Sequence, residues 1–508
     1  MKSRWFNYRP LFLIFAFLAL GSVISLYICG GTLSIVLTII FSLATLVLLI
    51  VIAVLKRKPK YFFVPFVAFV VGVAMYYGGV ALFNRGVDYE PETISARVYN
   101  VSNMADGRVT LRADDVEFNG KKINDNITIF VYDNTGLFEN LEIGAKISFT
   151  PRTFYKNELF FDGIPNSRNY RDKLKYSTSV YAENIEYKGT DKTFAEKIKQ
   201  KVRDNLDGVL SNENIEIAYS SLFGDKSLLF DDVGASFKLA GVAHIIAVSG
   251  LHVGIIVGVI FGIMKLLHIK NEWAKFIITT IFLGFYCYIC GFAISVIRAS
   301  VMAICLMLSR IFKREYDSLS AISLAGIILF VFDPFVIFDV GFLMSFSCVL
   351  GIVFISRPIK KALLHTKMPK WLAEALALSI STMVSLIFVM AYFFKTFNAI
   401  SLIANMVIIP IFTFAYTILF LLTMFSLILP FLRYLIVLID PIFEFVRITA
   451  TFFAGVNWAN LGTISFQFIA IIIYFLLLLI ISRICTAKRG YRAIITLPIV
   501  AILLLFLI

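Results

Sequence analysis

Three long, uninterrupted apolar runs dominate the first part of the chain. They cover Pro10–Ile28, Leu33–Leu55 and Tyr61–Phe83, and each approaches or exceeds the roughly 20 residues that cross a bilayer as a helix. Helix is the expected form, because it satisfies its own backbone hydrogen bonds where lipid offers no partner. The basic residues before Pro10 resemble the start of a signal peptide, but no small-residue cleavage site follows. The sequence therefore predicts three retained membrane helices.

Short alternating segments replace the long runs between Arg85 and about Asp207. Alternation of apolar and polar residues with a period of two is typical of half-buried strands. The predicted strands are Thr93–Val101, Arg108–Phe118, Ile127–Tyr132, Ala145–Thr153 and Val180–Tyr187. Five short strands suit a small barrel, and the oligonucleotide/oligosaccharide-binding (OB) fold is one candidate. We expect an extracytoplasmic, OB-like β domain over residues 85–192.

A second hydrophobic block begins near Phe237, after an amphipathic helix (Thr193–Leu210) that opens a connector over residues 193–236. Basic loops divide this block, residues 237–508, into spans. The clearer spans are His244–Leu267, Phe276–Cys290, Phe292–Ser309, Leu319–Phe332, Val336–Ser356 and Trp371–Phe394, followed by a run broken at Pro410 and by segments ending near Gly455, Ser482 and Ile508. Together with the N-terminal segment, residues 1–84, this predicts a polytopic α-helical membrane protein of about 11 to 13 helices with an inserted β domain.

Composition agrees with this reading. The chain has 508 residues, of which 59% are hydrophobic and 16% charged, and its mean hydropathy of +0.86 lies outside the range of soluble globular proteins. Much of the net charge of +14 sits in short loops between apolar runs, where it indicates a cytoplasmic side and a cytoplasmic N-terminus. The six cysteines show no disulfide framework.

Scarce polar residues cluster in the stretch His244-Ile-Ile-Ala-Val-Ser-Gly-Leu-His-Val-Gly254. Polar side chains at membrane depth usually mark a pathway or a reactive centre, because hydrocarbon offers them no hydrogen-bond partner. His244 and His252 could face one cavity with Ser249 only if the helix is locally distorted. These residues could line a polar cavity or form hydrogen-bonded packing contacts, and both interpretations stay open. A metal site is a weaker interpretation, since no HExxH spacing occurs.

Glycines recur at every fourth position from Gly250 through Gly254 and Gly258 to Gly262. This spacing places them on one helical face and predicts close approach of a neighbouring helix.

Further polar residues interrupt the later apolar runs. Arg298 has no charged neighbour for ten positions on either side, and a buried arginine needs an anion or a wet cavity. We expect a phosphate contact or, alternatively, an ion pair with a carboxylate such as Asp339. Asp333 and Asp339 flank a short turn, where capping is the ordinary role of aspartate. Asn405, five residues before Pro410, is typical of an interrupted helix that lines a site, although kinked packing explains it equally well.

No nucleotide-binding loop is encoded. Gly224-Asp-Lys-Ser227 lacks the first glycine of the phosphate-binding loop, so any energy for transport must come from a partner or a gradient. Asp225 in this stretch is expected to have a structural or ion-pairing role. No catalytic residue, metal or cofactor is predicted.

These motifs together resemble the ComEC family, the membrane channel of bacterial competence. Ser221-Leu-Phe-Gly-Asp-Lys-Ser227 leads into His244–Gly254, and further matches follow in the same order. They are Ser295-Val-Ile-Arg298, Asp333-Pro334, Asp339-Val-Gly-Phe342, Ser345-Phe346 and Asn405–Pro410. The resemblance implies passage of single-stranded transforming DNA across the bacterial cytoplasmic membrane.

On that reading, the DNA pathway would contain His244, Ser249, Gly250, His252, Arg298 and Asn405. The resemblance also implies an outer DNA receptor and a cytoplasmic ATP-driven translocase as partners, with a homo-oligomer as an option. Many family members carry a C-terminal metallo-β-lactamase-like domain, but this sequence contains no His-x-His-x-Asp-His motif. It therefore reads as a short form, and no nuclease activity is carried over.

The β domain could itself contact DNA. Its basic residues are in excess only from Pro151 to Arg203, beside Phe154, Tyr155 and Phe160. Aromatic rings beside cations suit stacking on single-stranded bases. An ordinary barrel core is an equally good explanation.

Two other functions compete with DNA passage. An intramembrane serine hydrolase would use Ser249 activated by a histidine, although no triad acid is evident. A small-solute transporter would be expected to show inverted repeats, and none is found.

Overall fold

The computed structural model describes residues 10–28, 60–83, 92–103, 108–123, 126–132, 141, 143–156, 178–224, 231–366, 368–394, 397–398, 400–456 and 460–461. The chain forms two compact units. One comprises the described parts of Met1–Phe15, Arg203–Val331 and Val340–Ile508, and the other those of Ala16–Val202 and Phe332–Asp339. The predicted domain boundaries near residues 84, 192 and 236 stay predictions.

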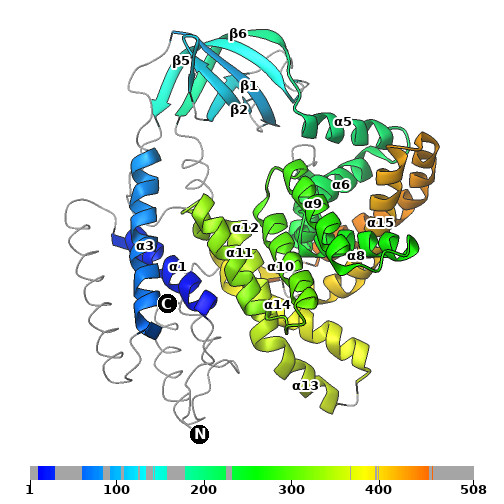
Figure 1. Cartoon of the computed structure of the whole chain (residues 1–508). Helices are drawn as coiled ribbons and strands as arrows, with labels where there is room; N and C mark the ends of the chain where they lie inside the picture. The colour runs from blue at the N-terminus through cyan, green and yellow to red at the C-terminus, as the bar shows by residue number, and fades with distance from the viewer. Residues whose placement is uncertain are drawn as a thin grey trace. The chain divides into compact units, whose positions relative to one another are not determined.

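The second unit contains a small β barrel (Figure 1). Its strands are β1 (Ile94–Asn103), β2 (Arg108–Phe118), β3 (Lys121–Ile123), β4 (Ile127–Tyr132), β5 (Ala145–Lys156) and β6 (Thr178–Thr190). The order is β1-β5-β6-β4-β2-β3, and an additional β1–β2 pairing closes five strands into a ring. The β4–β6 pair is parallel and the other pairs are antiparallel. The prediction of a small barrel of five main strands is confirmed.

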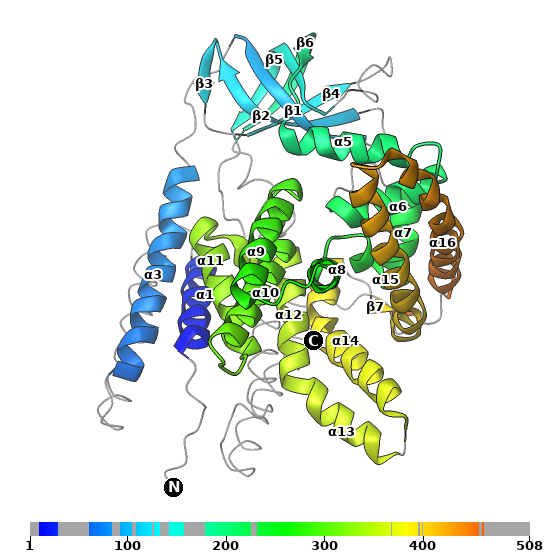
Figure 2. The same cartoon turned by 45° about the vertical axis from the view of Figure 1, so that its right-hand side comes forward.

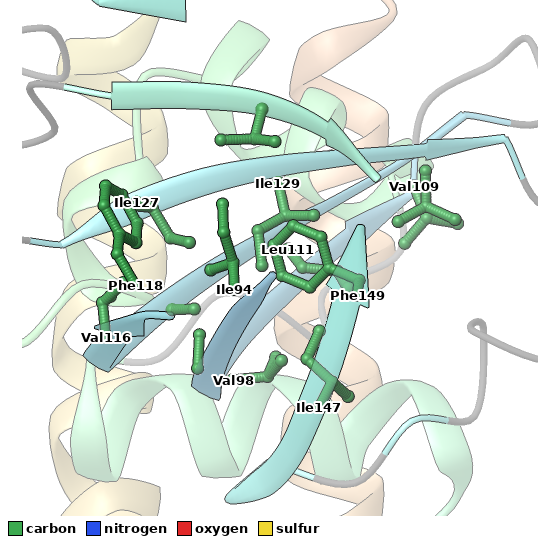
Figure 3. Close-up of a cluster of buried hydrophobic side chains, with 14 residues drawn as sticks. Ile94, Val98, Val109, Leu111, Val116, Phe118, Ile127, Ile129, Ile147 and Phe149 are labelled. Atoms are coloured by element: carbon green, nitrogen blue, oxygen red, sulfur yellow. The ribbon is translucent and has the colours of Figure 1, made fainter. Parts of the chain in front are cut away.

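Alternation along each strand builds the barrel core. Alternate residues of β2, such as Val109 and Leu111, and of β4, such as Ile127 and Ile129, point inward and are almost fully buried (Figure 3). Ile94, Phe149 and Val180 complete the core from the other strands. Period-two alternation thus places one face of every strand in a shared apolar interior. The predicted limits of two strands, Arg108–Phe118 and Ile127–Tyr132, coincide with β2 and β4.

Helix α5 (Phe194–Leu206) follows the barrel, within the predicted amphipathic helix. Thr193 and Glu196 exchange hydrogen bonds at its start, which is a reciprocal capping box. Arg97 on β1 joins this end of the helix to the barrel, because its guanidinium pairs with Asp114 at 2.7 Å and with Glu196 at 3.0 Å. Burial disfavours the charged form of Arg97, but the hydrogen bond and charge of Asp114, with Glu196 and Asp191, outweigh it and raise its pKa.

Two N-terminal helices approach each other closely through glycine. They are α1 (Pro10–Ile28) and α3 (Lys60–Phe83). A Cβ built on Gly72 would collide with the backbone carbonyl of Leu18, and one on Gly21 with that of Phe69. Ser22 donates from its hydroxyl to the Gly72 carbonyl at 3.2 Å. Small residues therefore let these backbones touch, as they do in membrane helix pairs.

The first unit is helical (Figure 2). Its elements are α6 (Asn212–Phe223), α7 (Asp231–Leu239), η1 (Ala243–Ile245), α8 (Gly250–Leu266), α9 (Glu272–Ile289), α10 (Ile294–Ile311), α11 (Ser318–Phe332), α12 (Val340–Gly351), η3 (Ile352–Ser356), α13 (Arg357–His365), α14 (Lys370–Phe394), α15 (Ser401–Ser426), η4 (Pro430–Ile439) and α16 (Asp440–Ala454). The short turn η2 (Val336–Phe338) lies before α12. Two-residue strands, β7 (Phe397–Asn398) and β8 (Asn460–Leu461), pair with each other.

Five helical segments in the described residues are long and apolar enough to cross a membrane. They are Glu272–Ile289, Ile294–Ile311, Val340–His365, Lys370–Ile387 and Ser401–Ser426, and four shorter apolar helices accompany them. The predicted spans Leu33–Leu55 and those after Leu461 lie outside the described residues. The chain is thus a largely helical membrane protein.

Two details of the predicted helices are wrong. The helix expected to begin at His244 begins at Gly250, because the preceding residues form the separate turn η1. The run expected to break at Pro410 is one continuous helix, α15, with Pro410 inside it. A proline removes only one backbone donor from a helix of 26 residues, and membrane helices tolerate this where neighbouring helices support the backbone.

Candidate functional site

The polar motif of the helical unit forms the N-terminus of α8. Ser249 is the N-cap residue, and its hydroxyl oxygen accepts from the Leu251 N–H at 3.2 Å. The Ser249 N–H donates to Nδ1 of His252 at 3.1 Å, and its hydroxyl lies 3.0 Å from the same nitrogen. His252 thus takes the place that glutamate or glutamine holds in the usual capping box. The required distortion between His244 and His252 is present, since the two residues belong to different helical elements.

His252 is enclosed by aromatic rings of α15. Its side chain is fully buried, with the Tyr416 ring centroid at 4.4 Å and that of Phe412 at 5.8 Å, both edge-on. Because Nδ1 accepts from Ser249, the neutral ring carries its proton on Nε2, and Nε2 has no hydrogen-bond partner among the described residues. His252 is therefore a hydrogen-bonded packing residue in this structure. A direct role of His252 in a pathway stays a prediction.

His244 is the more accessible of the two histidines. It lies in η1 with its side chain exposed, and it is close enough to His252 to interact electrostatically with it. Of this pair, His244 is better placed to meet a hydrated solute.

Arg298 reaches the same helix end from α10, which lies beside α8 (Figure 2). The side chain is only 6% exposed. Its Nη1 donates to the Ser345 carbonyl of α12 at 2.6 Å, and a Cβ built on Gly250 would lie 3.3 Å from Nη2. Nε has no partner, and no carboxylate of the described residues pairs with this guanidinium. The alternative ion pair with Asp339 stays a prediction, because Asp339 belongs to the other unit.

The start of α10 is tied to the motif by a second contact. Ser295 donates from its hydroxyl to the Val248 carbonyl at 2.6 Å. Val248 directly precedes Ser249, so this hydrogen bond holds the first turn of α10 against the residues that cap α8. The structure thus brings Arg298, Gly250, Ser249 and His252 together.

The other predicted pathway and packing residues make none of these contacts. Asn405 is half-buried on α15, and its Oδ1 has no partner among the described residues. Apart from the neighbouring residues and backbone of α8 itself, no atom of the described residues lies within 4 Å of a Cβ built on Gly254, Gly258 or Gly262. Close packing of another helix on this stripe stays a prediction. Of these four glycines, only Gly250 is closely approached by a neighbouring helix, through the Arg298 side chain of α10.

The predicted aspartates have different outcomes. Asp333 accepts from the Phe335 N–H at 3.0 Å, a contact that suits its expected role in the turn. Asp339 ends η2 and directly precedes α12, a position that suits capping. Asp225 lies outside the described residues.

The β barrel carries an aromatic pair that was not predicted. Phe130 of β4 lies opposite Tyr181 of β6 in the parallel register, and their ring centroids are 5.2 Å apart. Both residues alternate with core residues, so both rings lie on the outer face of the barrel and are half-buried. Of the predicted stacking residues, Phe154 and Tyr155 belong to β5, and Phe160 lies outside the described residues. Their stacking role stays a prediction.

These features define a class: a membrane protein that combines a small β barrel with a helical bundle holding a buried arginine at a helix N-terminus. Residues 221–487 match the family described as Competence protein. The chain belongs to this competence protein family, as its motifs indicated.

Two curated relatives match about half of the chain. ComE operon protein 3 of Bacillus subtilis is 28% identical over 256 residues, which cover 49% of this chain and 31% of that protein. Recombination protein 2 of Haemophilus influenzae is 23% identical over 269 residues, which cover 50% of this chain and 34% of that protein. The match therefore spans about a third of the length of each relative. No solved structure matches the chain.

Proposed function

We propose that this chain is a channel for single-stranded transforming DNA across the bacterial cytoplasmic membrane. The observation that carries the proposal is Arg298, a buried guanidinium without a carboxylate partner in the described residues, inside the segment that matches the competence family. A polyanion in a membrane needs fixed donors and cations in place of its hydration. Arg298, the start of α8 and the exposed His244 are groups of this kind.

The β barrel would receive the strand outside the cell. Its strand order and its parallel β4–β6 pair are compatible with an OB-like fold, and OB folds bind single strands on a sheet face. The outward rings of Phe130 and Tyr181 offer a surface on which bases can stack. We further propose about 11 to 13 spans with a cytoplasmic N-terminus. An outer DNA receptor and a cytoplasmic ATP-driven translocase would be the partners, and self-association is an option.

Labelled-DNA uptake in cells with and without the chain tests this function. Surface-bound and internalised DNA are scored separately. Loss of internalised DNA with normal surface binding is the expected result in cells that lack the chain. Normal internalisation in those cells would contradict the proposal.

An intramembrane serine hydrolase is the second candidate, and the contact between the Ser249 hydroxyl and His252 Nδ1 at 3.0 Å favours it. A nucleophile and its base need such a distance. The same contact is part of the α8 cap, however, and no acid among the described residues orients His252 through Nε2. Labelling of the chain by a fluorophosphonate, lost in Ser249→Ala, would establish the hydrolase. Absence of labelling in the folded wild-type chain would remove it.

A further inference from the structure

The N-terminus of α8 and the guanidinium of Arg298 lie next to each other, and both have hydrogen-bond donors without an acceptor among the described residues. The first N–H groups of a helix have no carbonyl partner within it. The Ser249 hydroxyl oxygen accepts a hydrogen bond from the Leu251 N–H. The Gly250 N–H has no acceptor among the described residues. A helix of 17 residues also has partial positive charge at its N-terminus. Two sources of positive potential therefore meet at Gly250.

The orientation of Arg298 is specific. Nη1 is held by the Ser345 carbonyl, so the opposite edge of the guanidinium, which carries Nε and Nη2, is the edge left for another ligand. Nη2 lies at Gly250, and Nε is buried without a partner. This edge has two parallel N–H donors that match two oxygens of a carboxylate or phosphate.

We infer that Arg298 and the N-terminus of α8 form a binding site for one phosphodiester group of the translocating strand. The inference rests on the proposed function for the identity of its ligand. The Nε–Nη2 edge would bind two phosphate oxygens, and the Gly250 N–H would donate to the same group. Helix N-termini bind phosphates in this manner. Binding would also neutralise a cation whose burial is otherwise unfavourable.

Gly250 provides the room that this site requires. A Cβ there would lie 3.3 Å from Nη2 and 3.9 Å from the Ala299 Cβ, so a methyl group would crowd both the guanidinium and its ligand. Gly254, one turn later on the same helix, has no described atom within 4 Å of a built Cβ apart from the neighbouring residues and backbone of α8 itself. Gly250→Ala and Gly254→Ala are therefore a matched pair, because each adds one methyl group to the same helix.

A structural role is the rival explanation. Arg298 also links α10 to α12 through Ser345, and a purely structural arginine would affect folding rather than ligand binding. Arg298→Lys separates the two roles, because lysine keeps the charge and can still reach a carbonyl, but it has no bidentate edge.

Binding of oligothymidylate to the full chain in nanodiscs, followed by fluorescence anisotropy, tests the site. We expect Arg298→Lys to weaken binding by about tenfold, in line with the loss of one bidentate contact. Gly250→Ala should weaken it by about threefold, and Gly254→Ala should leave it unchanged. An oligothymidylate with an uncharged methylphosphonate backbone should bind weakly to the wild type and show no dependence on Arg298.

The inference is overturned if Arg298→Lys and Gly250→Ala, folded as judged by gel filtration, bind the charged strand as tightly as the wild type. It is also overturned if the uncharged strand shows the same dependence on Arg298. A failure of the proposed function would give a different result. Cells without the chain would then internalise DNA normally, whether or not the purified protein binds the oligonucleotide.

Discussion

Two arginines with little exposed surface, Arg97 in the β-barrel unit and Arg298 in the helical unit, differ in how their positive charge is compensated. The side chain of Arg97 is 13% exposed and has two carboxylate partners, Asp114 and Glu196. Arg298 is 6% exposed, and among the described residues it has one carbonyl partner and no carboxylate. Ion pairing compensates the first charge within the fold. The second charge has no carboxylate partner among the described residues, which is the pattern expected where a protein must bind an anion.

The largest expected effect is on Arg298. Arg298→Leu should abolish DNA internalisation in cells, because the proposed phosphate contact is lost. The same change should leave the unfolding temperature of the purified chain little changed, because the removal of a buried charge without a carboxylate partner offsets the loss of the hydrogen bond to the Ser345 carbonyl. Differential scanning fluorimetry, a membrane-fraction immunoblot and the uptake assay measure these outcomes. Normal uptake would remove Arg298 from the pathway.

The barrel core gives the next largest effect, on stability alone. Leu111 is fully buried on β2, and Leu111→Ala should destabilise the barrel by about 2–5 kcal/mol through lost burial and the remaining cavity. Hydrogen–deuterium exchange of the β1–β6 peptides in the full chain reports this change. Tyr187→Ala, at a side chain 60% exposed, is the control and should change stability by less than about 0.5 kcal/mol. Equal exchange in the two variants would contradict the assignment of the core.

Arg97→Met should have an intermediate effect. It leaves Asp114 and Glu196 facing each other without a cation, and we expect a loss of about 1–3 kcal/mol in barrel stability. The matched control is Arg152→Met, because the Arg152–Glu183 pair is exposed on both sides and such pairs contribute at most about 1 kcal/mol. If both variants show the same small change in hydrogen exchange, the contrast between Arg97 and Arg298 loses its basis.

The difference between the units also explains what the sequence could predict. The limits of β2 and β4 were predicted correctly because alternation directly reports a strand with one buried face. The start of α8 was missed because Ser249 is followed at the third position by histidine, which the usual capping-box pattern does not include. Continuity through Pro410 depends on neighbouring helices. The pairing of Phe130 with Tyr181 depends on a parallel register between segments about 50 residues apart, which no local pattern encodes.

The smallest expected effect concerns acid pH and two exposed ion pairs of the barrel unit. A hydrogen bond from Lys146 lowers the pKa of Asp191, and one from Lys122 lowers that of Asp115. A lowered pKa in the folded state means that the stabilisation is present above the unfolded value, about 3.9, and is lost as pH falls through the folded value. We expect Asp191→Asn to reduce the barrel's unfolding temperature slightly at pH 6 and not at pH 2.5, and high salt should reduce the difference. The same shift at both pH values would show that the Asp191 charge does not contribute.

The effect of Arg298→Leu on the unfolding temperature should not depend on pH in this way, because no described carboxylate pairs with Arg298. A pH-dependent change in the unfolding temperature of this variant would reveal an acidic partner.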